Sequence, residues 1–283
     1  FLGLASHEYF HLWNVKRMKP AAFTPYDLSQ ETHTSLLWVF EGVTSYYDDL
    51  GLVRSGLLES RSYLELLGQT ITRVMRGAGR RRQSVAESSF DAWTKFYKQD
   101  ANAANAIVSY YAKGSLVALV TDLKLRTETD GQISLDDVLR AAWQRWGESG
   151  EGMPEDGFEE LIVEMAGFDI RDFLDAAIRG TGELPLETLL RSHGIEYKLR
   201  RSQGASDKGG KPGDEGKAPD VWLGADLGGD NGQLRFRVVH NGGPAERAGI
   251  APGDELVALD GLRINAAGAE ARTRRYKAGD RSE

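Results

Sequence analysis

Apolar residues recur at helical spacing through most of the first 200 residues. The segments LLWVFEGVTSYYDDL, YLELLGQTITRVM and AIVSYYAKGSLVALVTDLKL place apolar side chains three or four positions apart, which is typical of helices with a buried face. Pro20 and Pro25 interrupt this pattern, so residues 18–32 are expected to form a loop. Shorter helices are expected between residues 155 and 200. The pattern therefore predicts a mainly α domain over residues 1–201.

The pattern changes after residue 201. The stretch SQGASDKGGKPGDEGKAP, residues 202–219, cannot build an apolar core and predicts a flexible linker or long loop. Beyond it, LRFRVV alternates and ELVALDG is a short apolar run that ends in a turn, and both patterns predict strands. PAERAGIAPGD between them predicts a short helix. Residues 220–283 are therefore expected to form a small α/β domain.

The composition narrows the class of protein. The chain has 283 residues, of which 41% are hydrophobic and 27% are charged, as in soluble globular proteins. A net charge of −7 argues against nucleic acid as a partner, because proteins that bind it usually carry a basic stripe. No apolar run is long enough to span a membrane. The absence of cysteine excludes disulfides and thiolate ligands, while the compartment, cytoplasm or periplasm, stays open.

Candidate chemistry begins with HEYFH at residues 7–11. Positions four apart share one face of a helix, so His7 and His11 can direct ring nitrogens at one metal ion. Glu8 lies about 100° further round the helix, where it would flank the ion and not bind it. A carboxylate in that place suits a general base beside a metal-bound water.

A zinc ion at this pair would need a third protein ligand. His33 would give a three-histidine site, and a carboxylate from another helix is the alternative. We favour Glu41, because the apolar neighbours Trp38 and Phe40 predict a buried helix in which an unpaired carboxylate would be costly. Two histidines, one carboxylate and one open position form the ligand set of catalytic zinc. The sequence thus predicts Zn²⁺ bound by His7, His11 and Glu41.

Several motifs together resemble one family. HEYFHLWNVKR, LWVFEGVTSYY, FDAWTKFY and YYAKG are similar to the glycyl aminopeptidase family of zinc metallopeptidases, which are gluzincins with HExxH and a downstream Glu. The resemblance implies a mainly α, thermolysin-like catalytic domain followed by a small α/β PDZ-like domain. It also implies a β-domain before the HExxH helix, so we expect this chain to be a fragment that lacks it.

The resemblance also assigns residues around the expected metal. Tyr111 in YAKG matches a tyrosine that donates a hydrogen bond to the oxyanion; the alternative is a core aromatic, since Tyr110 and Leu116 indicate a buried face. Either Ser45 or Asp48, which follow Glu41, could orient a ligating histidine. The sequence leaves this choice open.

The C-terminal segment resembles a bacterial PDZ domain, most clearly in GGPAERAG and APGDELVALDG. Such domains bind a peptide or a protein C-terminus at a sheet edge, and a loop holds its carboxylate. Residues 222–224 are the expected loop. A small domain with only a structural role is the alternative.

Three functions follow from these expectations. The resemblance implies a zinc-dependent aminopeptidase acting on peptides with a small N-terminal residue such as Gly or Ala. A zinc endopeptidase with the same machinery remains open, because the carboxylate that binds the substrate amine is expected in the upstream β-domain. A PDZ peptide-binding protein with an inactive peptidase domain is the third, and the intact set His7, Glu8, His11, Glu41 and Tyr111 argues against it.

Overall fold

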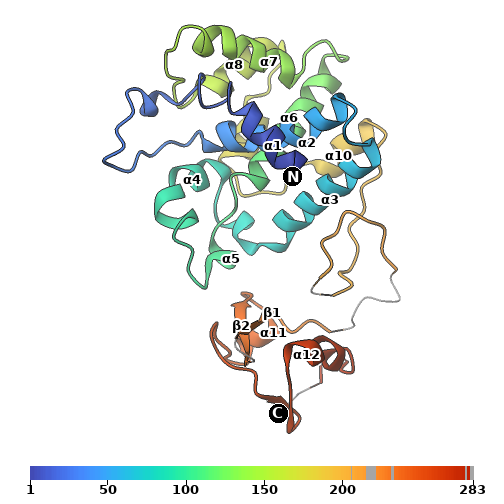
Figure 1. Cartoon of the computed structure of the whole chain (residues 1–283). Coiled ribbons are helices and arrows are strands. Elements are labelled where there is room, and N and C mark those ends of the chain that lie inside the picture. The colour runs from blue at the N-terminus through green and yellow to red at the C-terminus, as the bar shows by residue number, and fades with distance from the viewer. Residues whose placement is uncertain (205, 215–220, 231–232, 278, 281–283) are drawn as a thin grey trace.

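The chain folds into a mainly helical part followed by a small part that contains all the described strands (Figure 1). The computed structural model describes residues 1–204, 206–214, 221–230, 233–277 and 279–280. The helical part has the following elements: α1 (Leu2–Phe10), η1 (Ala21–Phe23), η2 (Trp38–Val43), α2 (Thr44–Arg54), α3 (Ser60–Arg76), η3 (Ala78–Arg81), α4 (Val85–Phe90), η4 (Ala92–Phe96), α5 (Ala103–Ala106), α6 (Ala112–Glu128), α7 (Leu135–Ala142), η5 (Trp143–Gly147), α8 (Gly157–Ala166), α9 (Arg171–Ile178) and α10 (Leu186–Ser192). The predicted mainly helical chain with a small C-terminal α/β part is confirmed.

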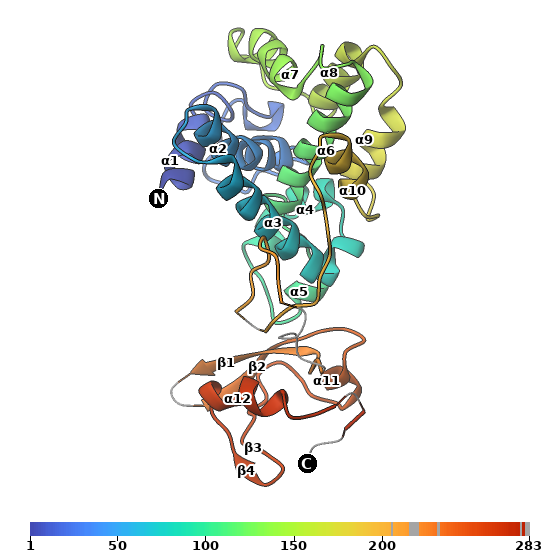
Figure 2. The same ribbon diagram turned by 90° about the vertical axis from the view of Figure 1, so that its right-hand side faces the viewer.

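Helix α6 is the centre of the helical part. It is buried on all sides along most of its length, as expected of a helix that is surrounded by others. Figure 2 shows it between α2 and α3 on one side and α9 and α10 on the other. Its side chains join one continuous apolar cluster with Trp38, Phe40, Phe158 and Ile162.

Two glycines let the short helix η2 approach the first turn of α6. A Cβ added at Gly42 would lie 2.7 Å from the Cα atom of Gly114 and 2.8 Å from the carbonyl oxygen of Tyr110. Real side chains do not approach so closely, so only glycine fits at Gly42 without a shift of backbone. Helix η2 is a π-helical segment, a form that is often found at functional sites. The contact places Glu41 beside the start of α6.

The C-terminal part has two small antiparallel sheets. Strands β1 (Ala225–Asp230) and β2 (Gln233–Val239) pair with each other, and β3 (Ala258–Leu259) pairs with β4 (Leu262–Arg263). The short helices α11 (Pro244–Arg247) and α12 (Ala266–Thr273) complete it. Phe236, Val239 and Ala245 form its own small core, which is separate from the core around α6.

The segment expected to be a linker is described in part. Residues 205 and 215–219 lie outside the described residues. Within residues 206–214, Asp207 pairs with Arg200 at 2.6 Å and Lys211 pairs with Glu65 of α3 at 3.2 Å. The described stretch therefore lies against the helical part.

Nothing among the described helices has both the length and the apolar character needed to cross a membrane.

The close contact at Gly42 leads to the first prediction. Gly42→Ala forces a Cβ against backbone atoms, so it should lower the free energy of unfolding by about 1–3 kcal/mol. Gly51→Ala in α2 is the control, because its Cβ would meet only Ser6 Oγ at 3.6 Å. That variant should be neutral or more stable by up to about 1 kcal/mol, since alanine favours a helix. Urea unfolding of both variants checks this; equal stability of the two would contradict it.

Candidate metal centre

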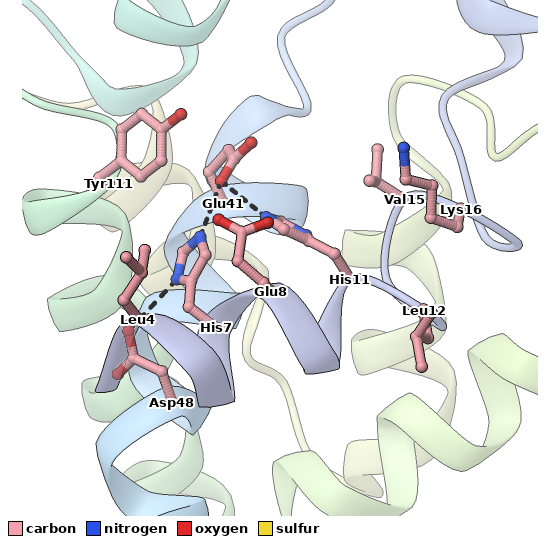
Figure 3. A pocket seen from close by; sticks show the side chains of 10 residues that line it. All are labelled: Leu4, His7, Glu8, His11, Leu12, Val15, Lys16, Glu41, Asp48 and Tyr111. Atoms are coloured by element: carbon pink, nitrogen blue, oxygen red, sulfur yellow. Dashed lines mark hydrogen bonds and ion pairs between the residues drawn. The ribbon is translucent and has the colours of Figure 1, made fainter. Parts of the chain in front are cut away.

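Helix α1 presents His7 and His11 to the carboxylate of Glu41 on η2. The Nε2 atom of His7 lies 3.2 Å from Glu41 Oε2, and that of His11 lies 3.3 Å from the same oxygen. Donor atoms of the three side chains all lie within 4.8 Å of one another, the one such group of His and acidic residues in the described ranges. The i, i+4 spacing of His7 and His11 puts the two imidazole rings on the same face of helix α1, as Figure 3 shows.

The other ring nitrogen of each histidine already has an acceptor. His7 Nδ1 donates to Asp48 Oδ2 at 3.2 Å, and His11 Nδ1 donates to the carbonyl oxygen of Asn14 at 2.8 Å. With the hydrogen held on Nδ1, a neutral ring has its lone pair on Nε2. With an ion between the three side chains, both lone pairs could face it together with the Glu41 oxygen. In the absence of an ion, a proton on Nε2 is donated to Glu41. Of the two candidates for this orienting role, Asp48 contacts a histidine; no contact of Ser45 with either ring is found in the described structure.

Charge and burial oppose each other in this cluster. Hydrogen bonds to Asp48 and Glu41 raise the pKa of His7 to about 9. Burial acts to lower the pKa of His11, but its hydrogen bonds to Glu41 and the Asn14 carbonyl outweigh burial and raise it. Burial acts to raise the pKa of Glu41, yet its hydrogen bonds with His11 and His7 hold it below the ordinary value. A carboxylate that carries charge in this half-buried place needs a cationic partner.

A strained turn follows the two histidines. Val15 has a φ of 116°, a region that β-branched residues rarely adopt. The neighbouring Asn14 is fully buried, and its Nδ2 donates to the Val39 carbonyl at 2.9 Å and to Thr44 Oγ1 at 3.1 Å. These bonds fix the carbonyl of Asn14 that accepts from His11. The sequence identified Asn14 only as part of a motif; its role required the turn geometry.

Glu8 and Tyr111 line the same open cleft as the histidines. Figure 3 shows the Glu8 carboxylate turned toward the place where the two imidazole rings and Glu41 meet, with Tyr111 on the other side of Glu41. The Tyr111 and His7 rings are stacked, with 6.4 Å between the two ring centroids. The cleft measures about 570 Å³, a size that suits a short stretch of peptide.

Two residues considered at this site do not line the cleft. Tyr110 is fully buried, and its hydroxyl donates to the Tyr97 hydroxyl at 3.1 Å. His33 bonds to the Phe90 carbonyl oxygen at 2.9 Å, outside the cleft. The structure thus gives the core aromatic role to Tyr110 and the cleft position to Tyr111, and it does not place His33 with the other histidines.

The donor set is that of a candidate metal centre in a helical domain. Two imidazole Nε2 atoms and one carboxylate oxygen meet at a cleft, and imidazole, once its Nε2 proton is lost, and carboxylate are ligands that zinc accepts. Because each Nδ1 is already occupied by an acceptor, the Nε2 atoms are the ones free to bind an ion. The residues therefore fit a divalent metal.

Comparisons with known proteins relate the chain to aminopeptidases. Residues 1–117, which contain every site residue above, match the family M61 glycyl aminopeptidase. The chain is also similar to an aminopeptidase N family protein from Idiomarina loihiensis of known crystal structure, with 41% sequence identity and a TM-score of 0.93 over 99% of this chain. This chain covers 47% of that protein, about half its length. No curated protein matches this chain.

The raised pKa of His7 generates a prediction for the metal-free protein. Its protonated form is stabilised by Asp48 and Glu41, so that stability is fully present below about pH 6.5 and is lost as the pH rises toward about 9. The melting temperature of chelator-treated protein should fall across this range. In His7→Gln the fall should be smaller, because the group that loses its proton is gone. An identical pH dependence in both proteins would contradict the assignment.

Proposed function

We propose that this chain is the catalytic part of a zinc-dependent aminopeptidase of the glycyl aminopeptidase family. The observation that carries the proposal is the convergence of His7 Nε2 and His11 Nε2 on Glu41 Oε2 at the wall of a peptide-sized cleft. The match of residues 1–117 to the M61 glycyl aminopeptidase family supports it. Proteins of this class hydrolyse peptide bonds near an N-terminus, and the family name favours a small N-terminal residue, Gly or Ala, as the preferred substrate.

His7, His11 and Glu41 would hold the zinc ion. When bound, zinc supplies Lewis-acid chemistry, because it polarises a carbonyl oxygen and makes water more acidic. The chain contributes the orientation of these ligands: Asp48 fixes the ring of His7 and the Asn14 carbonyl fixes the ring of His11.

Glu8 acts as the general base. Its position in the cleft lets the carboxylate take a proton from the water that attacks the scissile carbonyl carbon. The new C–O bond forms while the carbonyl π electrons move to oxygen. The electron pair on oxygen then re-forms the carbonyl π bond, the C–N bond breaks with its electron pair on nitrogen, and Glu8 delivers the proton to that nitrogen. Proton and electron balance closes with one water consumed.

Tyr111 supports the negative charge that develops on the carbonyl oxygen. Burial, and then the nearby charge of Glu41, raises the pKa of its hydroxyl well above the ordinary value. The hydroxyl therefore keeps its hydrogen at neutral pH and can donate it to the oxyanion. A donor already in place when charge develops stabilises the transition state more than the substrate.

The C-terminal part is proposed as a PDZ-like module for a peptide or protein C-terminus. Among the described strands, β1 pairs only with β2, so its other edge can accept a peptide strand. Residues 222–224 precede β1 and contain Gly224 with a φ of 76°, which suits a tight loop that turns amide groups toward a carboxylate.

The proposal predicts one zinc per chain and activity that depends on it. Full-length protein purified without chelator should contain zinc and should hydrolyse glycyl or alanyl substrates, while N-blocked peptides should react much more slowly. Glu41→Ala should lose zinc and activity together, because two imidazoles alone bind the ion weakly. Elemental analysis and substrate hydrolysis are the measurements.

His33→Ala is the matched control, since His33 was the rival third ligand and lies outside the cleft. It should keep zinc and activity. Full zinc content in Glu41→Ala would disprove the ligand assignment, and equal hydrolysis of N-blocked peptides would favour the endopeptidase.

The role of Tyr111 predicts a loss in kcat without a loss in binding. Tyr111→Phe removes only the hydroxyl, so kcat should fall by about 10²–10³ while KM stays nearly unchanged. Zinc content and melting temperature should match the unmodified protein, because the ring still packs.

Tyr110→Phe serves as the comparison. It removes the hydroxyl that donates to Tyr97, outside the cleft, and should leave kcat within a few-fold. Equal losses in the two variants, or an unchanged kcat in Tyr111→Phe, would refute the oxyanion role.

A further inference from the structure

The buried side chain of Asn105 joins the helical part to the C-terminal part. It lies in α5 and is 2% exposed. Its Oδ1 accepts from the backbone N–H of Asn241 at 3.0 Å, and its Nδ2 donates to the carbonyl oxygen of Val239 at 2.8 Å and to Asn102 Oδ1 at 3.0 Å. Both ends of the amide are therefore satisfied, as a buried polar group requires. In Figures 1 and 2, α5 is the helix of the helical part that faces β1 and β2.

The backbone held by Asn105 also frames the loop before β1. Val239 pairs with Ala225 at the end of the sheet, and the N–H of His240 donates to the carbonyl oxygen of Gly224 at 2.8 Å. The residues that contact Asn105 are thus the neighbours of the loop at residues 222–224. A shift of that loop would act on the two bonds that Asn105 makes across the junction.

On the other side, a short segment leads from Asn105 to Tyr111. Ile107 has extended dihedral angles, φ −118° and ψ 157°, and extended chain has little slack. Its backbone lies so close to Gly79 that a Cβ there would be 1.9 Å from the Ile107 carbonyl oxygen. The next residue, Val108, accepts from Ser88 Oγ and donates its N–H to Gln83 Oε1 at 3.1 Å. This clamped segment ends at Tyr111, the N-cap residue of α6, where the Tyr110 carbonyl lies against Gly42.

We propose that Asn105 is a positioning residue through which the C-terminal part holds the Tyr111 segment in its catalytic place. The proposal rests on the role of Tyr111 proposed above. It makes the rate of hydrolysis depend on the seating of the C-terminal part, although that part contributes no residue to the cleft. It also gives a route by which a ligand at residues 222–224 would alter the rate.

Asn241→Pro would remove one of the hydrogen bonds across the junction by a change in the C-terminal part. The turn from His240 to Gly243 has a hydrogen bond from the Gly243 N–H to the His240 carbonyl at 2.9 Å, and Gly242 has a φ of 72°. With a negative φ at Asn241 this is a type II turn, in which proline is favoured at the position of Asn241. The substitution therefore keeps the turn and deletes only the N–H that Asn105 accepts from. Asn241→Ala is the matched control, because it keeps that N–H and removes the same side chain.

Steady-state hydrolysis of an alanyl substrate by the zinc-loaded full-length protein is the measurement. Asn241→Pro and Asn105→Ala should each lower kcat by about 10- to 100-fold with little change in KM, the size expected when a catalytic group is displaced by about 1 Å. Asn241→Ala should match the unmodified protein. Zinc content should be unchanged in all three.

The decisive arm combines Asn241→Pro with Tyr111→Phe. If Asn105 acts through Tyr111, adding Asn241→Pro to the Tyr111→Phe variant should cause no further loss of kcat, because the hydroxyl is already absent. A full additional loss would show a general structural effect and overturn the inference, as would an unchanged kcat in Asn241→Pro. If Tyr111→Phe alone kept the kcat of the unmodified protein, the proposed oxyanion role of Tyr111 would fail. The junction variants Asn241→Pro and Asn105→Ala test the role of Asn105 by their own kcat values.

Discussion

The contact between Gly42 and the backbone of Tyr110 and Gly114 determines the geometry of the whole site. Helix η2 carries Glu41 one residue before Gly42, and Tyr111, next to Tyr110, immediately precedes α6 as its N-cap residue. Because no side chain separates the two backbones at Gly42, the carboxylate and the tyrosine come to the same wall of the cleft. A methyl group there would push η2 away from α6. Glu41, the proposed metal ligand, and Tyr111, the proposed oxyanion donor, would then move apart.

Partly buried charges at the site would destabilise the folded protein unless acidic and basic side chains alternate. Asp48, His7, Glu41 and His11 follow one another in space as acid, base, acid and base. Without a metal, protons on the histidines balance the carboxylates, which is why the pKa values of both rings are raised. A divalent ion can replace these protons. The contacts that stabilise the protonated form are therefore also the ones that would orient the proposed ligands, and metal binding would release protons.

Part of the site could be predicted because the chemistry is local. The spacing of His7 and His11 places both rings on one helix face, and apolar neighbours show that Glu41 lies on a buried helix. The choice between Ser45 and Asp48 could not be made, because η2 is π-helical and an additional residue in a turn rotates every later position relative to the ordinary helical period. The two-part, mainly helical architecture followed from periodicity. The bridge at Asn105 could not be foreseen, because in QDANAANAI it looks like one more polar residue of a loop.

The turn after HEYFH shows how strain and function coincide at this site. A left-handed conformation is unfavourable for valine, yet Val15 is held there by bonds on both sides: its N–H donates to the Met18 carbonyl at 2.9 Å, and the Lys16 N–H donates to the His11 carbonyl at 3.0 Å. The turn brings the Asn14 carbonyl back to His11 Nδ1. In the described structure the buried Oδ1 of Asn14 has no hydrogen-bond partner. The turn therefore has two unfavourable features, the backbone conformation of Val15 and this unpaired oxygen. A protein selected only for stability would relax both. Their presence beside a ring that faces Glu41 indicates that the orientation of His11 is what the local structure preserves.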